Sequence, residues 1–180
     1  MTVYTVGHST RSAEELLALL RDAGIEVLVD VRSFPRSRTN PQFNIETLPN
    51  TLKPAGIAYR HARDLGGRRN KQDLGYPSPN GFWRNASFRN YADYALTPAF
   101  RSALAALVAL AEEKTCAVMC AEAAWQRCHR QIITDHLLGL GHEVVHIVAE
   151  NRMEPAQINA GAELQADGVV HYPAAQGELL

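Results

Sequence analysis

The fold of this chain can be read from one stretch, Cys116-Ala-Val-Met-Cys120-Ala-Glu122-Ala-Ala-Trp125-Gln-Arg127-Cys128-His129-Arg130. Residues 115–119 have no polar face, which is typical of a strand covered on both sides. After residue 130, apolar residues recur at helical spacing as far as Leu140. The pattern predicts a buried strand, a short loop and a helix that starts near Arg127. A strand of this kind belongs to a parallel sheet flanked by helices.

The rest of the sequence extends the same alternation of strands and helices. Ser12 and Glu15 form a capping box that opens one helix, and Thr97 with Pro98 opens another, whereas Pro49 and Pro54 limit residues 44–53 to short turns. A hairpin is expected over residues 162–172, around an Asp-Gly pair. Further strands are expected at 3–6, 25–31, 57–62 and 143–149, and further helical residues at 88–96.

These elements predict a single α/β domain over residues 1–180. It has about five mainly parallel strands flanked by helices, and a β-hairpin in the tail, residues 150–180. Segments 33–56 and 63–85 are rich in Gly, Pro, Asn and Arg, so we expect loops there. A long loop inside a compact domain is usually functional or disordered, and the aromatic residues of these loops favour a function.

Composition narrows the class of protein. The chain has three cysteines, an odd number, and the apolar surroundings of Cys116 predict a buried, reduced thiol. The first residues lack the pattern of a signal peptide, and no apolar run approaches the roughly eighteen residues of a membrane span. We therefore expect a cytoplasmic protein without a membrane segment. The sequence indicates no oligomeric state.

The charge is unevenly distributed. Residues 32–94 hold eleven Lys or Arg against four acidic residues, a net charge of +7, although the whole chain carries −1. The same segment holds nine of the thirteen aromatic residues. Cations interleaved with aromatic rings suit an anionic small molecule, a nucleotide or a single-stranded nucleic acid. The alternative is a solvated Arg-rich loop held in place by a few core aromatics.

A site is expected where the strands end, because the carboxyl ends of parallel strands meet at one edge of a sheet. His8, Arg32 and Cys120 each follow such a strand. Cys120 is the candidate nucleophile, Glu122 the candidate acid or base, and His8 the candidate titrating partner. The alternatives are a buried structural thiol, an ion pair of Glu122 with an arginine, and a core histidine.

Anion binding is predicted around these groups, because a helix start and several guanidinium groups lie close to Cys120 in sequence. The same groups would stabilise a thiolate, so Cys120 is expected to ionise more readily than Cys128, with Cys116 inert. The candidate anion-binding residues are Ser9, Arg32, Arg36, Arg38, Arg68, Cys128, His129 and Arg130.

Several motifs resemble the DUF488 family almost end to end. They are Gly7-His8-Ser9-Thr10, Asp30-Val31-Arg32-Ser33-Phe34-Pro35, Leu65-Gly66-Gly67-Arg68, Tyr91-Ala-Asp-Tyr94, Cys120-Ala-Glu122 and Cys128-His129-Arg130. The resemblance implies a single α/β domain with a site at these motifs. It implies no reaction.

The preferred hypothesis is a cysteine-dependent hydrolase or transferase acting on a phosphorylated, nucleotide or nucleic-acid-like substrate. One alternative is a non-catalytic module that binds nucleotides or single-stranded nucleic acid. Another is a redox-sensing pair formed by Cys120 and Cys128. A third is a metal site with Cys120, Cys128, His129 and His8 as ligands, although the Cys-x7-Cys spacing differs from a compact zinc knuckle. No cofactor is indicated by any sequence motif.

Overall fold

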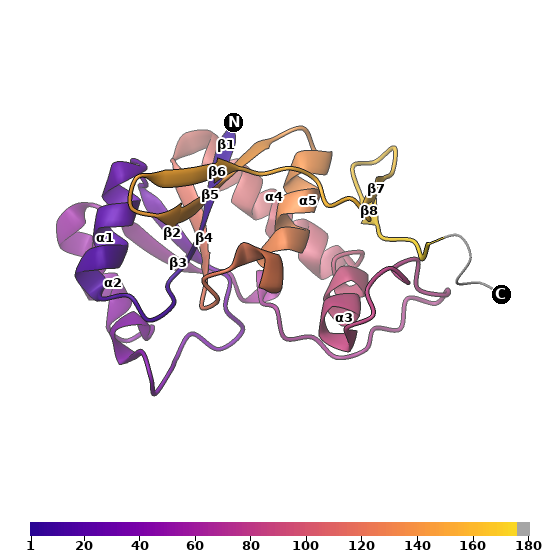
Figure 1. Cartoon of the computed structure of the whole chain (residues 1–180), viewed down its shortest axis with the longest axis horizontal. Coiled ribbons are helices and arrows are strands. Elements are labelled where there is room, and N and C mark those ends of the chain that lie inside the picture. Colours follow the sequence, from indigo (N-terminus) through magenta and orange to yellow (C-terminus); the bar gives the residue numbers. More distant parts are fainter. Residues whose placement is uncertain (176–180) are drawn as a thin grey trace.

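The computed structural model describes residues 1–175 and contains a six-stranded sheet in the order β3-β2-β4-β1-β5-β6 (Figure 1). The strands of this sheet are β1 (Thr2–Gly7), β2 (Val27–Asp30), β3 (Ala58–His61), β4 (Cys116–Cys120), β5 (Glu143–Ala149) and β6 (Arg152–Pro155). The first five strands are parallel and β6 is antiparallel to β5. The predicted α/β class and the five predicted strands are confirmed, whereas β6 was not foreseen.

Strand β4 lies between β1 and β2, although β1 and β2 come first along the chain. Its first four residues are buried, as expected of a strand without a polar face. Gly7 at the end of β1 is paired with Cys120, and Asp30 at the end of β2 is paired with Met119. The insertion of β4 therefore brings Cys120 between the ends of β1 and β2.

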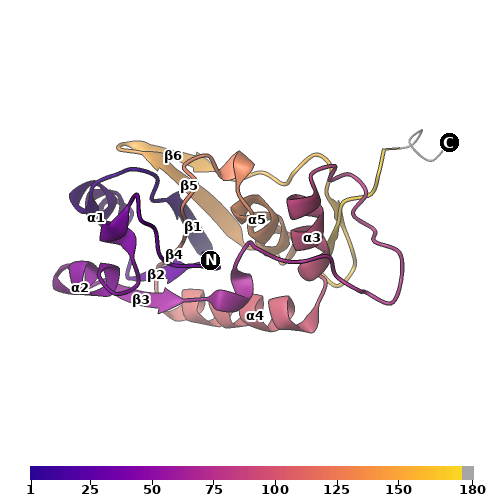
Figure 2. The ribbon, with the colours of Figure 1, turned by 90° about the horizontal axis from the view of Figure 1, so that it is seen from below.

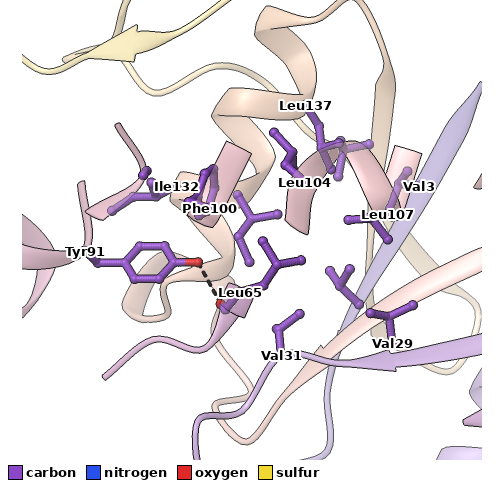
Figure 3. Packing of buried hydrophobic residues seen from close by; sticks show 14 of the residues in the cluster. Val3, Val29, Val31, Leu65, Tyr91, Phe100, Leu104, Leu107, Ile132 and Leu137 are labelled. Atoms are coloured by element: carbon purple, nitrogen blue, oxygen red, sulfur yellow. Dashed lines mark hydrogen bonds between the residues drawn. The ribbon is translucent and has the colours of Figure 1, made fainter. Parts of the chain in front are cut away.

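Helices cover both faces of the sheet (Figure 2). One face packs on α1 (Ala13–Asp22) and α2 (Leu48–Leu52), and the other on α4 (Pro98–Glu113) and α5 (Arg130–Gly139). Helix α3 (Ala86–Tyr94) joins the second core beside these two helices and beyond the sheet. Strand β2 shows the two-residue period that makes this possible, because Val29 joins the second face and Leu28 the first. Figure 3 shows the second core, in which Val29 and Val31 lie near Leu65 and residues of α4 and α5.

The helix starts follow local chemistry. The capping box of Ser12 and Glu15 opens α1, and the Thr97 side chain caps α4. Helix α5 starts later than expected, because residues 125–127 form a short 3-10 turn and His129 is the N-cap of α5. Cys128 therefore precedes the helix and does not lie in its first turn.

The predicted loops contain only short elements, and the predicted hairpin is present. Segment 33–56 holds α2 and the 3-10 turns Pro41–Phe43 and Lys53–Ala55, and segment 63–85 holds the 3-10 turn Arg63–Leu65. Strands β7 (Glu163–Leu164) and β8 (Val170–His171) pair around Gly168, whose φ of 80° suits glycine. Residues 176–180 of the expected tail lie outside the described residues.

Within residues 1–175, no single helix is long and apolar enough to cross a membrane. Helices α3 and α4, which are bent by 74° relative to each other, meet the length and composition criteria only as a pair.

Candidate functional site

The carboxyl ends of β1, β2 and β4 open into a cleft of about 730 Å³. His8, Arg32 and Cys120 all line it, as their positions after three strands predicted. The backbone N–H of His8 donates to the carbonyl of Cys120 at 2.9 Å and so continues the pairing of β1 with β4 past the last strand residue. The site therefore lies at the expected edge of the sheet.

Gly7 allows the loop after β4 to cross the end of β1. A Cβ atom on Gly7 would lie 1.9 Å from the carbonyl oxygen of Glu122, much closer than any real contact. Ser9, with a φ of 51°, donates its backbone N–H to the carbonyl of Ala121 at 2.9 Å. Loop 121–124 is thus held against β1, and residues 121–123 line the cleft.

Two thiols and one imidazole form a compact group in this cleft, which we call the thiol–imidazole cluster: Cys120, Cys128 and His129. Their ligand atoms all lie within 4.8 Å of one another. His129 Nδ1 is 3.9 Å from Cys120 Sγ and 3.6 Å from Cys128 Sγ. Cys120 is partly buried, whereas Cys128 is only 4% exposed.

The ring of His129 is fixed from three sides. Its Nε2 lies 2.8 Å from the carbonyl oxygen of Val31, so Nε2 carries the proton and donates it. A Cβ on Gly67 would lie 2.4 Å from Nδ1, so the glycine of the Leu65-Gly66-Gly67 run lets the loop pack onto the ring. Tyr91 meets the ring edge to face and is anchored by its hydroxyl, which donates to the carbonyl of Leu65 (Figure 3). Nδ1 is left facing the two sulfur atoms.

The two cysteines differ in acidity, in the order opposite to that expected. The hydrogen bond with Cys128 and burial together raise the pKa of Cys120 to about 12. Burial opposes ionisation of Cys128 as well, but the hydrogen bond from Cys120 and the charge and N–H groups of Arg130 lower its pKa to about 6. The hydrogen bonds of Arg130 thus favour ionisation of Cys128 over Cys120, opposite to the expectation from the sequence. The reason is the late start of α5, because the free N–H of Arg130 reaches Cys128 Sγ, at 3.5 Å.

Arg130 does not line the cleft, contrary to the expectation that it binds an anion there. Its side chain is 1% exposed and donates inward to Cys128 Sγ, Thr5 Oγ1 and the carbonyls of Glu122 and Ala123. A buried guanidinium is expensive unless its donors are satisfied, and these acceptors satisfy it. Arg130 therefore positions loop 121–124 and the sulfur of Cys128.

The same contacts orient the peptide groups of loop 121–124. In a trans peptide the C=O and the N–H point in opposite directions. Because the carbonyls of Glu122 and Ala123 point to Arg130, the N–H groups of Ala123 and Ala124 point away from it. Ala124 N–H lies 3.5 Å from the Glu122 carboxylate, so an anionic oxygen of this chain already lies at one of these amides. Successive amides of this kind favour an anion.

His8 and Arg32 line the cleft, and both are engaged in contacts that their positions in the sequence did not indicate. Burial lowers the pKa of His8, the hydrogen bond to Ser9 opposes this, and the charge of Arg32 adds to it. Nδ1 of His8 lies 2.8 Å from the Ser9 carbonyl and Nε2 lies 3.2 Å from Arg32 Nη1, so both ring nitrogens are engaged. Arg32 forms a two-point ion pair with buried Asp30. His8 is thus held by the Ser9 carbonyl and by Arg32, and it lies outside the thiol–imidazole cluster.

The remaining cations of the cleft fall into two kinds. Arg36 lines the cleft but pairs with Glu46, and Arg38 does not line it. Arg68 and Arg127 also line it, and within residues 1–175 neither guanidinium has a carboxylate partner. Arg68 lies over the ring of Phe34, 5.4 Å from its centroid. Arg127 was not among the candidate binding residues, although its place beside Cys128 could have indicated it.

The aromatic residues of segment 32–94 serve mainly the core. Phe43, Tyr91 and Tyr94 are buried. Phe34 is 67% exposed and, with partly buried Phe88, borders the cleft. The alternative of an Arg-rich loop held by core aromatics thus describes most of these rings, and few are left for stacking on a ligand.

Comparison with known proteins gives one match. The family model "Domain of unknown function DUF488" matches residues 12–137, from the start of α1 to within α5. No curated protein and no solved structure matches the chain significantly. The matched residues contain the thiol–imidazole cluster, loop 121–124 and the arginines of the cleft. Since the match covers more than half of the sequence, the chain belongs to the DUF488 family.

Proposed function

We propose that this protein is an enzyme that acts on a phosphorylated small molecule in a hydrolase or transferase reaction. Its reactive group lies in the thiol–imidazole cluster, with Cys120 as the member more open to the cleft. The observation that carries the proposal is a shared location: the cluster lines one cleft with Arg68 and Arg127, two arginines that have no carboxylate partner within the described part of the chain. A reactive group and anion-binding groups are thus available to the same molecule.

The charge of the cleft supports an anionic substrate. Asp30 neutralises Arg32 and Glu46 neutralises Arg36, so within residues 1–175 the two remaining arginines, Arg68 and Arg127, face one remaining carboxylate of the cleft, that of Glu122. The backbone N–H of Ala123, which points away from Arg130 in a residue that lines the cleft, adds a further donor. Backbone amides and guanidinium groups together are the usual partners of phosphate oxygens.

The size of the cleft favours a small molecule over a nucleic acid. Its volume of about 730 Å³ lies within the range of roughly 300–1,000 Å³ that is usual for small ligands. A single-stranded nucleic acid would need a row of exposed rings on which bases stack, and most aromatic residues of segment 32–94 are not exposed. A nucleotide fits both the charge and the size.

The binding part of the proposal is tested by calorimetric titration of inorganic phosphate and of AMP at several salt concentrations. We expect affinity to fall as salt is added and to fall strongly in the double variant Arg68→Ala/Arg127→Ala. The matched control is Arg36→Ala/Arg38→Ala, which removes the same total charge. Arg36 is already paired with Glu46, and Arg38 does not line the cleft. Equal losses in the two double variants, or no phosphate binding by the wild type, would contradict the proposal.

The catalytic part is tested with a panel of phosphomonoesters, phosphodiesters and nucleotides, by measuring the release of phosphate or alcohol. Cys120→Ser keeps the shape of the side chain and removes the reactive sulfur. We expect it to abolish turnover while phosphate binding persists. A Cys120→Ser variant with wild-type turnover would reject a reactive role for this cysteine.

A further inference from the structure

The three ligand atoms of the thiol–imidazole cluster all lie within 4.8 Å of one another, close to the spacing of a metal site. Two sulfurs and one nitrogen around a four-coordinate zinc ion lie about 3.5–3.8 Å apart, given Zn–S and Zn–N bonds of about 2.3 and 2.0 Å. His129 Nδ1 lies 3.6 Å from Cys128 Sγ and 3.9 Å from Cys120 Sγ. Small side-chain movements would bring all three atoms onto one ion.

The surroundings of His129 match those of a metal ligand. A histidine that binds a metal with one nitrogen usually donates the other N–H to a carboxylate or a backbone carbonyl, which fixes the ring and leaves a lone pair for the metal. His129 donates Nε2–H to the Val31 carbonyl at 2.8 Å, and Nδ1 faces the two sulfurs. A disulfide between Cys120 and Cys128 would make no use of this orientation.

We propose that Cys120, Cys128 and His129 bind one divalent transition metal ion of the zinc type, with the fourth position open to the cleft. Thiolate and imidazole ligands select zinc, iron or cobalt over magnesium and calcium. Two thiolates balance the charge of the ion, and the Nε–H of Arg130 stays within reach of Cys128 Sγ, at 3.4 Å. Three protein ligands with a free position are typical of a catalytic site rather than a structural one.

This inference deepens the proposed function, because it names a cofactor for the same site. The three ligands line the same cleft as Arg68 and Arg127, so a fourth position open to that cleft would be accessible to an oxygen of an anionic substrate or to a water molecule. In the metal-bound protein Cys120 is a ligand, so loss of turnover in Cys120→Ser follows from either role and does not distinguish them. Metal binding itself does not depend on any substrate, so it can be tested separately.

The test is titration of the reduced, chelator-treated full-length protein with cobalt(II) in oxygen-free buffer. We expect one cobalt ion per chain, a thiolate-to-cobalt charge-transfer band in the near ultraviolet, and the strong visible bands of tetrahedral cobalt. Cys120→Ser, Cys128→Ser and His129→Ala should each weaken binding by more than about tenfold. Cys116→Ala is the matched control, because Cys116 is buried at the opposite end of β4. Circular dichroism verifies the fold of each variant, and partly exposed Cys120 provides a variant that should fold even if Cys128→Ser does not.

The inference is overturned if the wild type shows no thiolate-to-cobalt band, or if His129→Ala binds cobalt as tightly as the wild type. It is also overturned if zinc fails to slow iodoacetamide labelling of Cys120. Cobalt bands in a protein that binds no phosphate would uphold the metal site and reject the proposed substrate class. Phosphate binding without cobalt bands would do the reverse.

Discussion

His129, the residue before α5, donates its Nε2–H to the backbone carbonyl of Val31, the residue after β2, at 2.8 Å and across 98 positions of the chain. This bond joins the loop that follows β4 to the end of the neighbouring strand. It also sets the tautomer of His129 and directs Nδ1 to the two cysteines. The geometry of the thiol–imidazole cluster therefore depends on how three strand ends and the Gly66-Gly67 loop come together.

Gly67→Ala tests the packing around His129. A new Cβ would meet Nδ1 at 2.4 Å, so the ring has to move, and we expect a cost of about 1–3 kcal/mol together with loss of cobalt binding. Urea unfolding and cobalt titration measure the two effects. The control is Gly75→Ala, where φ is +74° but nothing lies within 4 Å of the new atom. An equal loss of cobalt binding in both variants would contradict this account of Gly67.

Gly7→Ala tests the close approach of loop 121–124 to β1. The new Cβ would lie 1.9 Å from a backbone oxygen, which no rotamer change relieves, so we expect destabilisation on the order of 3 kcal/mol or more. Thermal and urea unfolding provide the measurement. Gly141→Ala, at a φ of +86° with open space around it, should show backbone strain alone. A Gly7→Ala variant that is as stable as Gly141→Ala would show that the contact between loop 121–124 and β1 does not require a glycine at position 7.

Arg130→Met tests whether the hydrogen bonds donated by Arg130 hold loop 121–124 in place. The change keeps much of the buried volume but leaves the carbonyls of Glu122 and Ala123 without their donor, so we expect a loss of about 3 kcal/mol and weaker phosphate binding. Arg127→Ala is the matched comparison, because Arg127 is exposed and lines the cleft. It should weaken phosphate binding with little change in stability. Full stability of Arg130→Met would refute the supporting role.

Asp135 predicts a pH dependence of stability away from the cleft. Burial raises the pKa of its carboxyl to about 6, although the N–H of Asn159 and the O–H of Tyr172 oppose the shift. A raised native pKa means that the native state holds this proton more tightly than the unfolded chain does. The stabilisation is present at low pH and is lost as the pH rises through about 6.

Urea unfolding of the wild type and Asp135→Asn at about pH 4.5 and 7.5 measures this effect. The wild type should lose about 2 kcal/mol relative to the variant between the two conditions. Asp167→Asn is the control: a hydrogen bond from the Val169 backbone lowers the pKa of Asp167, so its contribution is lost only toward lower pH. A difference between wild type and Asp135→Asn that does not change with pH would show that the Asp135 carboxyl is ionised in the native state.

Much of the fold could be predicted from the sequence because its signals are local. Uninterrupted apolar runs mark β2 and β4, and capping residues mark α1 and α4. Local sequence patterns do not indicate the order of the strands in the sheet, so the position of β4 between β1 and β2 could not be predicted. Strand β6 was missed because its residues are mostly exposed and show no apolar period.

The position of the site was predicted correctly, but the roles of its residues were predicted only in part. Strand ends located His8, Arg32 and Cys120, because parallel topology alone brings such residues together. The burial of Arg130 depends on carbonyls from another loop, and the acidity of Cys128 depends on where α5 begins. These are tertiary contacts without a sequence period, so the sequence did not indicate that Arg130 donates to Cys128 and not to Cys120.

We propose that the thiol–imidazole cluster forms one anion site together with Arg68 and Arg127. The most direct measurement is the rate at which iodoacetamide labels Cys120 in the metal-free protein, read by peptide mass spectrometry with and without inorganic phosphate. The account predicts slower labelling when phosphate is present in the wild type, and no such protection in Arg68→Ala/Arg127→Ala. A labelling rate of Cys120 that stays the same at saturating phosphate in the wild type would contradict it.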